Sequence, residues 1–359
     1  GAESLESCTT SSYNTAVGFQ AGDSVTTGSG HNAIFGYFAA TQLTSGPFNT
    51  ALGTNSFRSE TTGQYNTAVG YSALEHQAGG TNNNVAVGFK AYEGIEGSTT
   101  GAQNTAIGTS SLQSTTTGGN NTAVGYQSMY ANTTGGLNAA LGRESLFKNT
   151  TGSQNTGCGT YTLYENTTGQ ENTAVGYEAL GKAVTASYNT AVGSRALDAN
   201  TSGTSNNALG YQTLTSNTTG SNCTALGHGA LAANTTGDQN TAVGANALDA
   251  NSTGVGNTAI GYDSLTTNST ADYNTGLGFY ALRENTTGNS NVAAGFRSLR
   301  YNTTGSRNTA VGYNACLVQT SGDRNTGIGF QALSQNSTGG YNTAVGDAAL
   351  ENSTTASNN

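Results

Sequence analysis

The side chains best suited to catalysis or metal binding are sparse in this sequence. Its 359 residues include three histidines, His31, His76 and His228, and 20 acidic residues. None of the histidines has a Cys, Asp or Glu at the spacing typical of metal sites or of nucleophilic catalysis. We therefore expect no catalytic residue, no metal site and no cofactor, and we predict that the chain is not an enzyme.

The four cysteines do not form an evident disulfide framework. Cys158 and Cys223 lie four sequence repeats apart, which at one strand spacing per repeat is roughly 19 Å and beyond the reach of a disulfide. Cys158 and Cys316 occupy apolar positions of the repeat, so we expect both to be buried as small hydrophobic residues. Cys8 is the one candidate for a bond between chains.

Basic residues gather in one stretch of an acidic chain. Eleven Lys and Arg give a net charge of -9, which excludes nucleic acid as a partner because its binding needs clustered positive charge. Five of them lie close together in the sequence and define a candidate patch for an anionic ligand: Arg283, Arg297, Arg300, Arg307 and Arg324. The alternative is local pairing with Glu284 and Asp323.

A second recurrent pattern is Asn followed two residues later by Thr or Ser, the acceptor sequence for N-glycosylation. The asparagines concerned recur at one position of the repeat, so two interpretations stand: a column of glycans, or a buried ladder of amides at a turn. They are Asn132, Asn149, Asn166, Asn200, Asn217, Asn234, Asn251, Asn268, Asn285, Asn302 and Asn336.

These residues belong to a repeat of 17 residues with the consensus N-T-A-V-G-Y-x-A-L-x-x-N-T-T-G-x-x, clear in residues 121–137. We number its positions 1 to 17 from the first Asn. Twenty copies begin between Asn14 and Asn342, with Cys223 in place of one Asn. The pattern predicts a lead-in segment 1–13, irregular coils 14–103, a regular solenoid 104–350 and a polar tail 351–359.

A strict short period indicates units that bury their apolar faces only against their neighbours. We predict an all-β, parallel β-solenoid (β-roll) of about twenty coils, each with two short strands and two turns. Valine at position 4 and leucine at position 9 should form the core. Because positions 3 and 5 are small, the other strand face should also be covered, and we expect three chains side by side.

Two further columns complete the prediction. At position 15 glycine should supply the positive φ of a tight turn. At position 6 twelve copies are aromatic, which favours either a packed spine or a strip for stacking on sugars.

The motifs Asn-Thr-Ala-Val-Gly, a following Leu and Asn-Thr-Thr-Gly resemble two groups of proteins. One is the head of trimeric autotransporter adhesins, and the other is the repeat of bacterial and phage tail-fibre-like proteins. The resemblance covers Asn14 to Leu350 and implies an extracellular, cell-surface or virion location.

The function expected from pattern and resemblance is that of a structural fibre or filament subunit with a role in surface attachment. The alternatives are a glycan-binding adhesin, a phage tail-fibre shaft and an ice-binding protein. The expected partners are further copies of the chain, as a homotrimer and as a head-to-tail filament through uncapped ends, together with surface glycans. No apolar run is long enough for a membrane span.

Overall fold

The computed structural model describes residues 1–27 and 30–359, so Gly28 and Ser29, within the predicted segment 14–103, lie outside it. The chain divides into two compact units, residues 1–186 and 187–359. Each unit contains ten parallel strands of three residues. The boundaries expected from the sequence near residues 13, 103 and 350 stay predictions.

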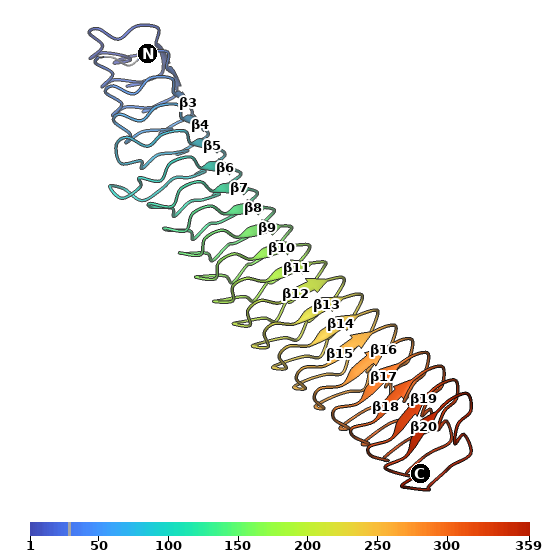
Figure 1. Cartoon of the computed structure of the whole chain (residues 1–359). Helices are drawn as coiled ribbons and strands as arrows, with labels where there is room; N and C mark the ends of the chain where they lie inside the picture. The colour runs from blue at the N-terminus through green and yellow to red at the C-terminus, as the bar shows by residue number, and fades with distance from the viewer. Residues whose placement is uncertain (28–29) are drawn as a thin grey trace. The chain divides into compact units, whose positions relative to one another are not determined.

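Every strand covers positions 2 to 4 of its repeat (Figure 1). In the first unit the strands are β1 (Thr15–Val17), β2 (Ala33–Phe35), β3 (Thr50–Leu52), β4 (Thr67–Val69), β5 (Val85–Val87), β6 (Thr105–Ile107), β7 (Thr122–Val124), β8 (Ala139–Leu141), β9 (Thr156–Cys158) and β10 (Thr173–Val175). In the second unit they are β11 (Thr190–Val192), β12 (Asn207–Leu209), β13 (Thr224–Leu226), β14 (Thr241–Val243), β15 (Thr258–Ile260), β16 (Thr275–Leu277), β17 (Val292–Ala294), β18 (Thr309–Val311), β19 (Thr326–Ile328) and β20 (Thr343–Val345).

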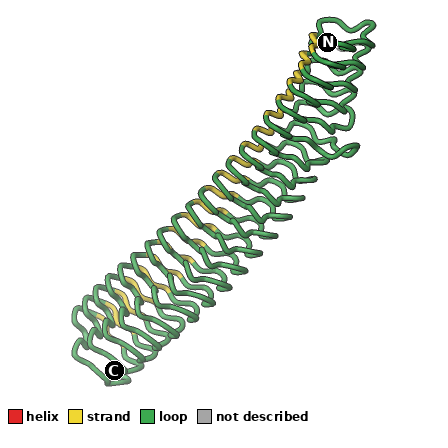
Figure 2. The backbone as a smooth tube through the Cα atoms, turned by 180° about the vertical axis from the view of Figure 1, so that it is seen from behind, coloured by secondary structure: helices red, strands yellow, loops and turns green. Residues whose placement is uncertain are grey.

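Within each unit, successive strands pair in parallel at the same positions of neighbouring coils, as Ala123 of β7 does with Ala140 of β8. The predicted all-β parallel β-solenoid is therefore confirmed in each unit. Figure 2 shows the strands along one side of the coils and loops elsewhere. Within residues 1–27 and 30–359, no helix is long and apolar enough to cross a membrane.

The prediction of two strands per coil is wrong, because the described coils contain one. The rest of each coil is joined to its neighbours by single backbone hydrogen bonds, such as Met129 N to Ser145 O at 2.9 Å and Thr133 N to Thr150 O at 2.9 Å. Positions 7, 9 and 17 adopt left-handed φ values, 50° at Gln127, 53° at Met129 and 61° at Leu137. Such residues bend the chain and prevent a second extended strand.

The core consists of the side chains at positions 3, 8 and 9. The predicted inward placement of position 9 is confirmed, since Leu74, Leu146 and Leu214 are fully buried, and Leu350 with 39% exposure is an exception. Position 3, mostly alanine, is also fully buried, as at Ala123.

The prediction that position 4 forms the core is wrong. Its side chains point outward, and Leu52 and Leu141 are 49% and 44% exposed. The cause is a lack of room, because a Cβ built on Gly157 at position 3 would lie 2.5 Å from Ser145 Oγ. Only alanine or glycine fits at most of these positions, so the larger apolar residue takes the outward-facing position.

Glycine at position 15 also serves a purpose other than the predicted one. Gly135 and Gly152 do not have positive φ. A Cβ on Gly135 would instead lie 2.6 Å from Asn132 Oδ1, closer than real Cβ contacts come. The corner of the coil packs directly on the next backbone and on an asparagine side chain, which favours glycine, and the alanines at this position, such as Ala186, are also buried.

Candidate functional site

The asparagines at position 12 form a hydrogen-bonded ladder within each unit. Asn149 Nδ2 donates to Asn132 Oδ1 at 2.8 Å and to Gly152 O at 2.9 Å. Asn251 in the second unit repeats this, donating to Asn234 Oδ1 at 2.9 Å and to Gly254 O at 3.1 Å. All eleven asparagines named from the sequence at this position are fully buried.

This geometry bears on the glycosylation interpretation. Both hydrogens of an amide such as Asn149 Nδ2 are donated inside the protein, and the side chain has no exposed surface. A glycan attached to that nitrogen would replace one hydrogen and break one of the two bonds. The folded coils therefore use these asparagines as ladder rungs.

A second ladder, whose role the sequence reasoning missed, runs along position 1. Asn138 N donates to Asn121 Oδ1 at 3.0 Å, and Asn121 Nδ2 donates to Gly135 O at 2.9 Å. Asn132 Nδ2 reaches the same Gly135 carbonyl at 3.1 Å, so the two ladders meet at one acceptor in each coil. The presence of Asn at position 1 in every copy but one was the available signal.

The threonines at position 13 are hydrogen-bonded as well. Thr133 Oγ1 donates to Thr150 O at 2.9 Å, and Thr218 Oγ1 donates to Thr235 O at 3.0 Å. Because these hydroxyl hydrogens bond the next coil, this column does not offer free donors to ordered water.

Of the five predicted arginines, three lie on two adjacent coils. Arg283 and Arg300 both lie against the ring of Tyr280, with guanidinium carbons 4.7 Å and 5.0 Å from its centroid. The guanidinium carbon of Arg297 lies 4.7 Å from the ring centroid of Phe296, the residue before it at position 6. We call Arg283, Arg297 and Arg300 the arginine cluster.

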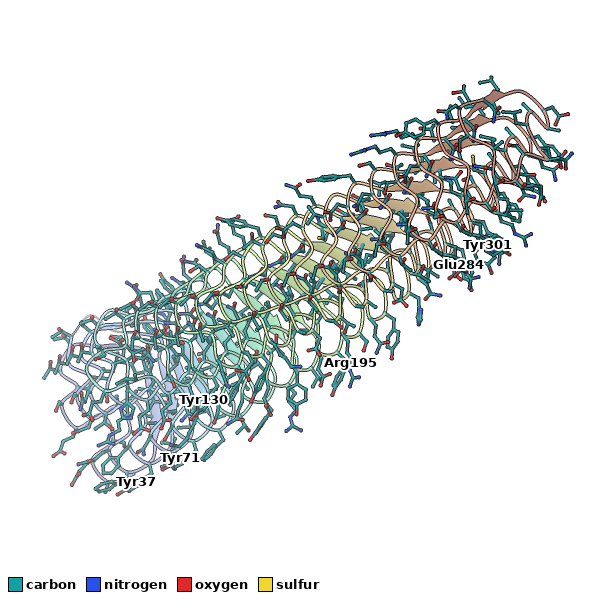
Figure 3. All side chains as sticks on the ribbon, turned by 90° about the horizontal axis from the view of Figure 1, so that it is seen from below. Tyr37, Tyr71, Tyr130, Arg195, Glu284 and Tyr301 are labelled. Atoms are coloured by element: carbon teal, nitrogen blue, oxygen red, sulfur yellow. The ribbon has the colours of Figure 1, made fainter. Side chains whose placement is uncertain are left out.

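Charge pairing in the arginine cluster is uneven. Arg283 is 3.3 Å from Glu284 Oε1 and 3.5 Å from Asp263 Oδ2, so its expected pairing with Glu284 is present. Among the described residues, Arg297 and Arg300 have no carboxylate partner, and the Nε atom of each is buried without a hydrogen bond. Figure 3 shows Glu284 and Tyr301, beside this cluster, on the outer surface.

Arg307 and Arg324 stand apart from the cluster, at position 17 beyond the asparagine corner. Arg324 hydrogen-bonds the hydroxyl of Tyr341 and lies 5.1 Å from its ring centroid. Asp323, the predicted partner, accepts instead from the backbone N of Ser306 at 2.7 Å. The structure therefore divides the predicted patch into two groups.

Aromatic rings at position 6 stack face to face. In the second unit an unbroken column of five rings has centroid separations of 5.1 to 5.5 Å and interplanar angles of 10° to 17°: Tyr262, Phe279, Phe296, Tyr313 and Phe330. Stacking on a sugar requires a free ring face, but these faces cover one another. The column fits the spine interpretation better than the sugar-binding one.

The outward side chains of position 4 form an apolar surface on each unit, which we call the column-4 strip. Members with 38% to 68% exposure are Val17, Phe35, Leu52, Ile107 and Leu141 in the first unit, and Leu209, Leu226, Ile260, Leu277, Val311, Ile328 and Val345 in the second. Cys158 belongs to the same column and is exposed, which corrects its predicted burial. Exposed apolar rows of this extent mark interaction surfaces.

The remaining cysteines behave differently. Cys316, at position 9, is fully buried as predicted, and burial raises the pKa of its thiol to about 12. Cys223 is also buried, and desolvation raises its pKa to about 11. All four cysteines are free, Cys8 included.

The histidines are not equivalent. His31 stacks between Tyr13 and Phe48, with centroids at 4.9 Å and 5.1 Å. His76 departs from the expectation of no acidic partner, because Glu75 and Glu93 each place a carboxylate oxygen within 4.8 Å of it and of one another. Sequence spacing concealed this group, since Glu93 belongs to the following coil.

No protein-family model matches the chain, and no curated protein matches it.

Proposed function

We propose that this chain is a structural fibre subunit that packs side by side with copies of itself, outside the cell or on a virion. The observation that supports self-association is the column-4 strip. A strand with one face packed on its own core and an apolar outer face is better stabilised when another apolar surface covers it.

The extent of the strip suits a protein interface. Together with the exposed side chains at position 6, the column-4 strip offers on the order of 100 Å² per coil, hence on the order of 1,000 Å² for ten coils, against about 800 Å² per partner in a standard interface. A second copy of the chain is the natural occupant, because its strip has the same repeat along the coils. The preferred assembly is a homotrimer, in which each strip is covered by neighbouring copies.

The structural role rests on the uniformity of the coils. The core, the ladders and the strip recur in coil after coil. Such uniform repetition suits a fibre, whose task is to extend a regular structure. The resemblance of the repeat to tail-fibre-like proteins and adhesin heads supports the extracellular, cell-surface or virion location. The proposal involves no catalytic step.

Light scattering on the purified full chain tests the assembly. We expect a mass of three chains for the parent protein. The double variant Leu226→Asp and Ile260→Asp should give the mass of one chain with an unchanged circular dichroism spectrum, because each carboxylate would be buried unpaired in the interface. Gln239→Asp, at an exposed residue outside the strip, should leave the mass unchanged. A parent protein that is monomeric at all concentrations would refute the proposal.

Cys158 reports the direction of packing. In a parallel assembly with coils in register, Cys158 of one copy faces Cys158 of another, and a mild oxidant should link them. Cys158→Ser should abolish the linked species, and Cys316→Ser should not, since Cys316 is buried. Linking that persists in Cys158→Ser would contradict parallel packing through this strip.

The arginine cluster favours a second candidate function, attachment to anionic surface glycans. Two guanidinium groups without carboxylate partners are suited to carboxylate or sulfate groups. Binding to a sulfated polysaccharide, and not to its desulfated form, should fall in Arg297→Gln with Arg300→Gln. Arg143→Gln, which removes an arginine already paired with Glu144 at 3.0 Å, is the matched control. Equal binding by all these proteins would exclude this role.

A further inference from the structure

We propose that Glu75, His76 and Glu93 form a binding site for a divalent transition metal ion, with zinc as the ion that fits best. The site lies in the first unit, on two adjacent irregular coils. This inference is independent of the proposed fibre function.

The fold brings the three residues together through the register of the coils. Glu75 and Glu93 occupy position 10 of successive coils, and His76 follows at position 11. His76 N donates to the backbone oxygen of Glu93 at 2.9 Å, which fixes the two coils side by side at this point. One ligand atom from each of the three side chains lies within 4.8 Å of the other two.

The imidazole supplies a second observation. Its Nδ1 atom is buried and has no hydrogen-bond partner. A buried ring nitrogen without a partner is unusual, because desolvating a polar atom without a hydrogen bond is costly. A metal ion held by the two neighbouring carboxylates and one imidazole nitrogen is the kind of partner this ring lacks.

Neighbouring groups already orient the two carboxylates. Arg58 lies 3.2 Å from Glu75 Oε1, and Lys90 lies 2.9 Å from Glu93 Oε1. Gln113 Nε2 donates to Glu93 Oε2 at 2.6 Å. Groups that hydrogen-bond ligating carboxylates hold them in place in metal sites. The side chains of Arg58 and Lys90 are 44% and 34% exposed, so both can turn to solvent when a cation arrives.

The ligand set selects the ion. One imidazole and two carboxylates suit zinc, which binds nitrogen at about 2.0 Å and carboxylate oxygen at about 2.0–2.2 Å, usually with four ligands. Calcium and magnesium prefer oxygen ligands alone. The three ligand atoms lie within 4.8 Å of one another, so one ion can bridge them, and water can occupy the fourth position.

Isothermal titration of the EDTA-treated full chain with zinc chloride tests the site. We expect one zinc per chain in the parent protein. His76→Gln and Glu93→Gln should each weaken the affinity at least about tenfold, because each removes a ligand. His31→Gln removes a histidine that has aromatic rings on both sides and should leave the affinity unchanged.

The variants also show whether a loss of zinc binding comes from misfolding. Glu93→Gln conserves shape, and its circular dichroism spectrum should match that of the parent. No zinc binding by the parent at millimolar zinc, or equal binding by the parent, His76→Gln and Glu93→Gln, would overturn the proposal. Assembly state is measured separately, so a failure here leaves the fibre proposal standing.

Discussion

At the scale of single residues, the structure depends on buried asparagine amides that hydrogen-bond one another from coil to coil. The ladder at position 12 is interrupted where the next coil lacks Asn. Asn166 precedes Ala183 and Asn302 precedes Gln319, and in both cases the asparagine Oδ1 is buried without a partner. Gln319 reaches its own corner carbonyl at 2.7 Å, but its Oε1 has no partner.

Gln319→Asn should repair this break. The shorter side chain would donate to Asn302 Oδ1 and accept from Asn336 Nδ2, as the other rungs do. We expect the free energy of unfolding to rise by about 1–2 kcal/mol, the net value of one or two hydrogen bonds. Chemical denaturation measures the change. Gln335→Asn, at an exposed residue outside the ladder, is the control, and an equal effect in both variants would contradict the explanation.

The sequence predicts part of this residue-scale picture. Periodicity alone placed the position-12 asparagines at a corner with a ladder as one of two interpretations. It did not assign a role to the position-1 asparagines, because Asn at the start of a motif is equally compatible with a solvent-exposed strand end. Nor did it relate His76 to Glu93, since their contact depends on the register between two coils of irregular length.

At the scale of the coil, three left-handed residues replace the second strand that we expected. Among the described residues, none with such a φ is Val, Ile or Thr, although the chain is rich in Thr. The reason is steric, because a branched Cβ clashes with the backbone in the left-handed region. Position 9 is therefore occupied mostly by leucine and never by isoleucine or valine among the described residues, whereas both occur at the extended position 4.

Leu214→Ile tests this explanation. Isoleucine has the volume of leucine, but at φ 48° its branched Cβ is strained, and we expect a loss of about 2 kcal/mol in stability. Leu214→Met is the matched control, because Met129 fills the equivalent place in another coil at φ 53°. Urea denaturation of the two variants gives the comparison. If Leu214→Ile were as stable as Leu214→Met, backbone strain would not explain the choice of residue.

The same coil explains why one face of the strand was predicted wrongly. Hydrophobicity ranks Val above Ala, so position 4 was expected inside. Inside the coil, however, position 3 packs directly on positions 8 and 9, so the volume of the side chain decides which residue fits there. Where position 3 is large, as at Ile34, position 9 of the preceding coil is a glycine, Gly22. A Cβ added to Gly22 would lie 2.9 Å from Ile34 Cδ1. Such compensation between coils cannot be read from one repeat.

At the scale of the whole molecule, the coils of each unit contact mainly their two neighbours, so the stability of a unit is a sum of nearest-neighbour terms. This leads to a prediction about deletions. Removing residues 257–273, one complete coil, joins position 17 of one coil to position 1 of another and keeps every column in register. Removing only residues 257–264 deletes β15 and leaves Leu265 and Asn268 without a complete coil.

We therefore expect the larger deletion to be the less harmful one. The 17-residue deletion should retain the parent spectrum and a melting temperature within a few degrees. The eight-residue deletion should show local proteolysis near residues 265–273. Circular dichroism and limited trypsin or chymotrypsin digestion provide the measurements. Greater damage from the longer deletion would mean that coils are not interchangeable.

The asparagine ladders finally give each solenoid unit a direction. Where a rung pairs with its neighbour, the amide oxygen accepts from the following coil and the donor belongs to that following coil, as in Asn149 Nδ2 to Asn132 Oδ1 and Asn138 N to Asn121 Oδ1. The amide dipoles of a column therefore add rather than cancel. One end of a ladder offers hydrogens and the other offers oxygens. Two such solenoids can extend a common ladder only by joining unlike ends, because like ends would set oxygen against oxygen or hydrogen against hydrogen.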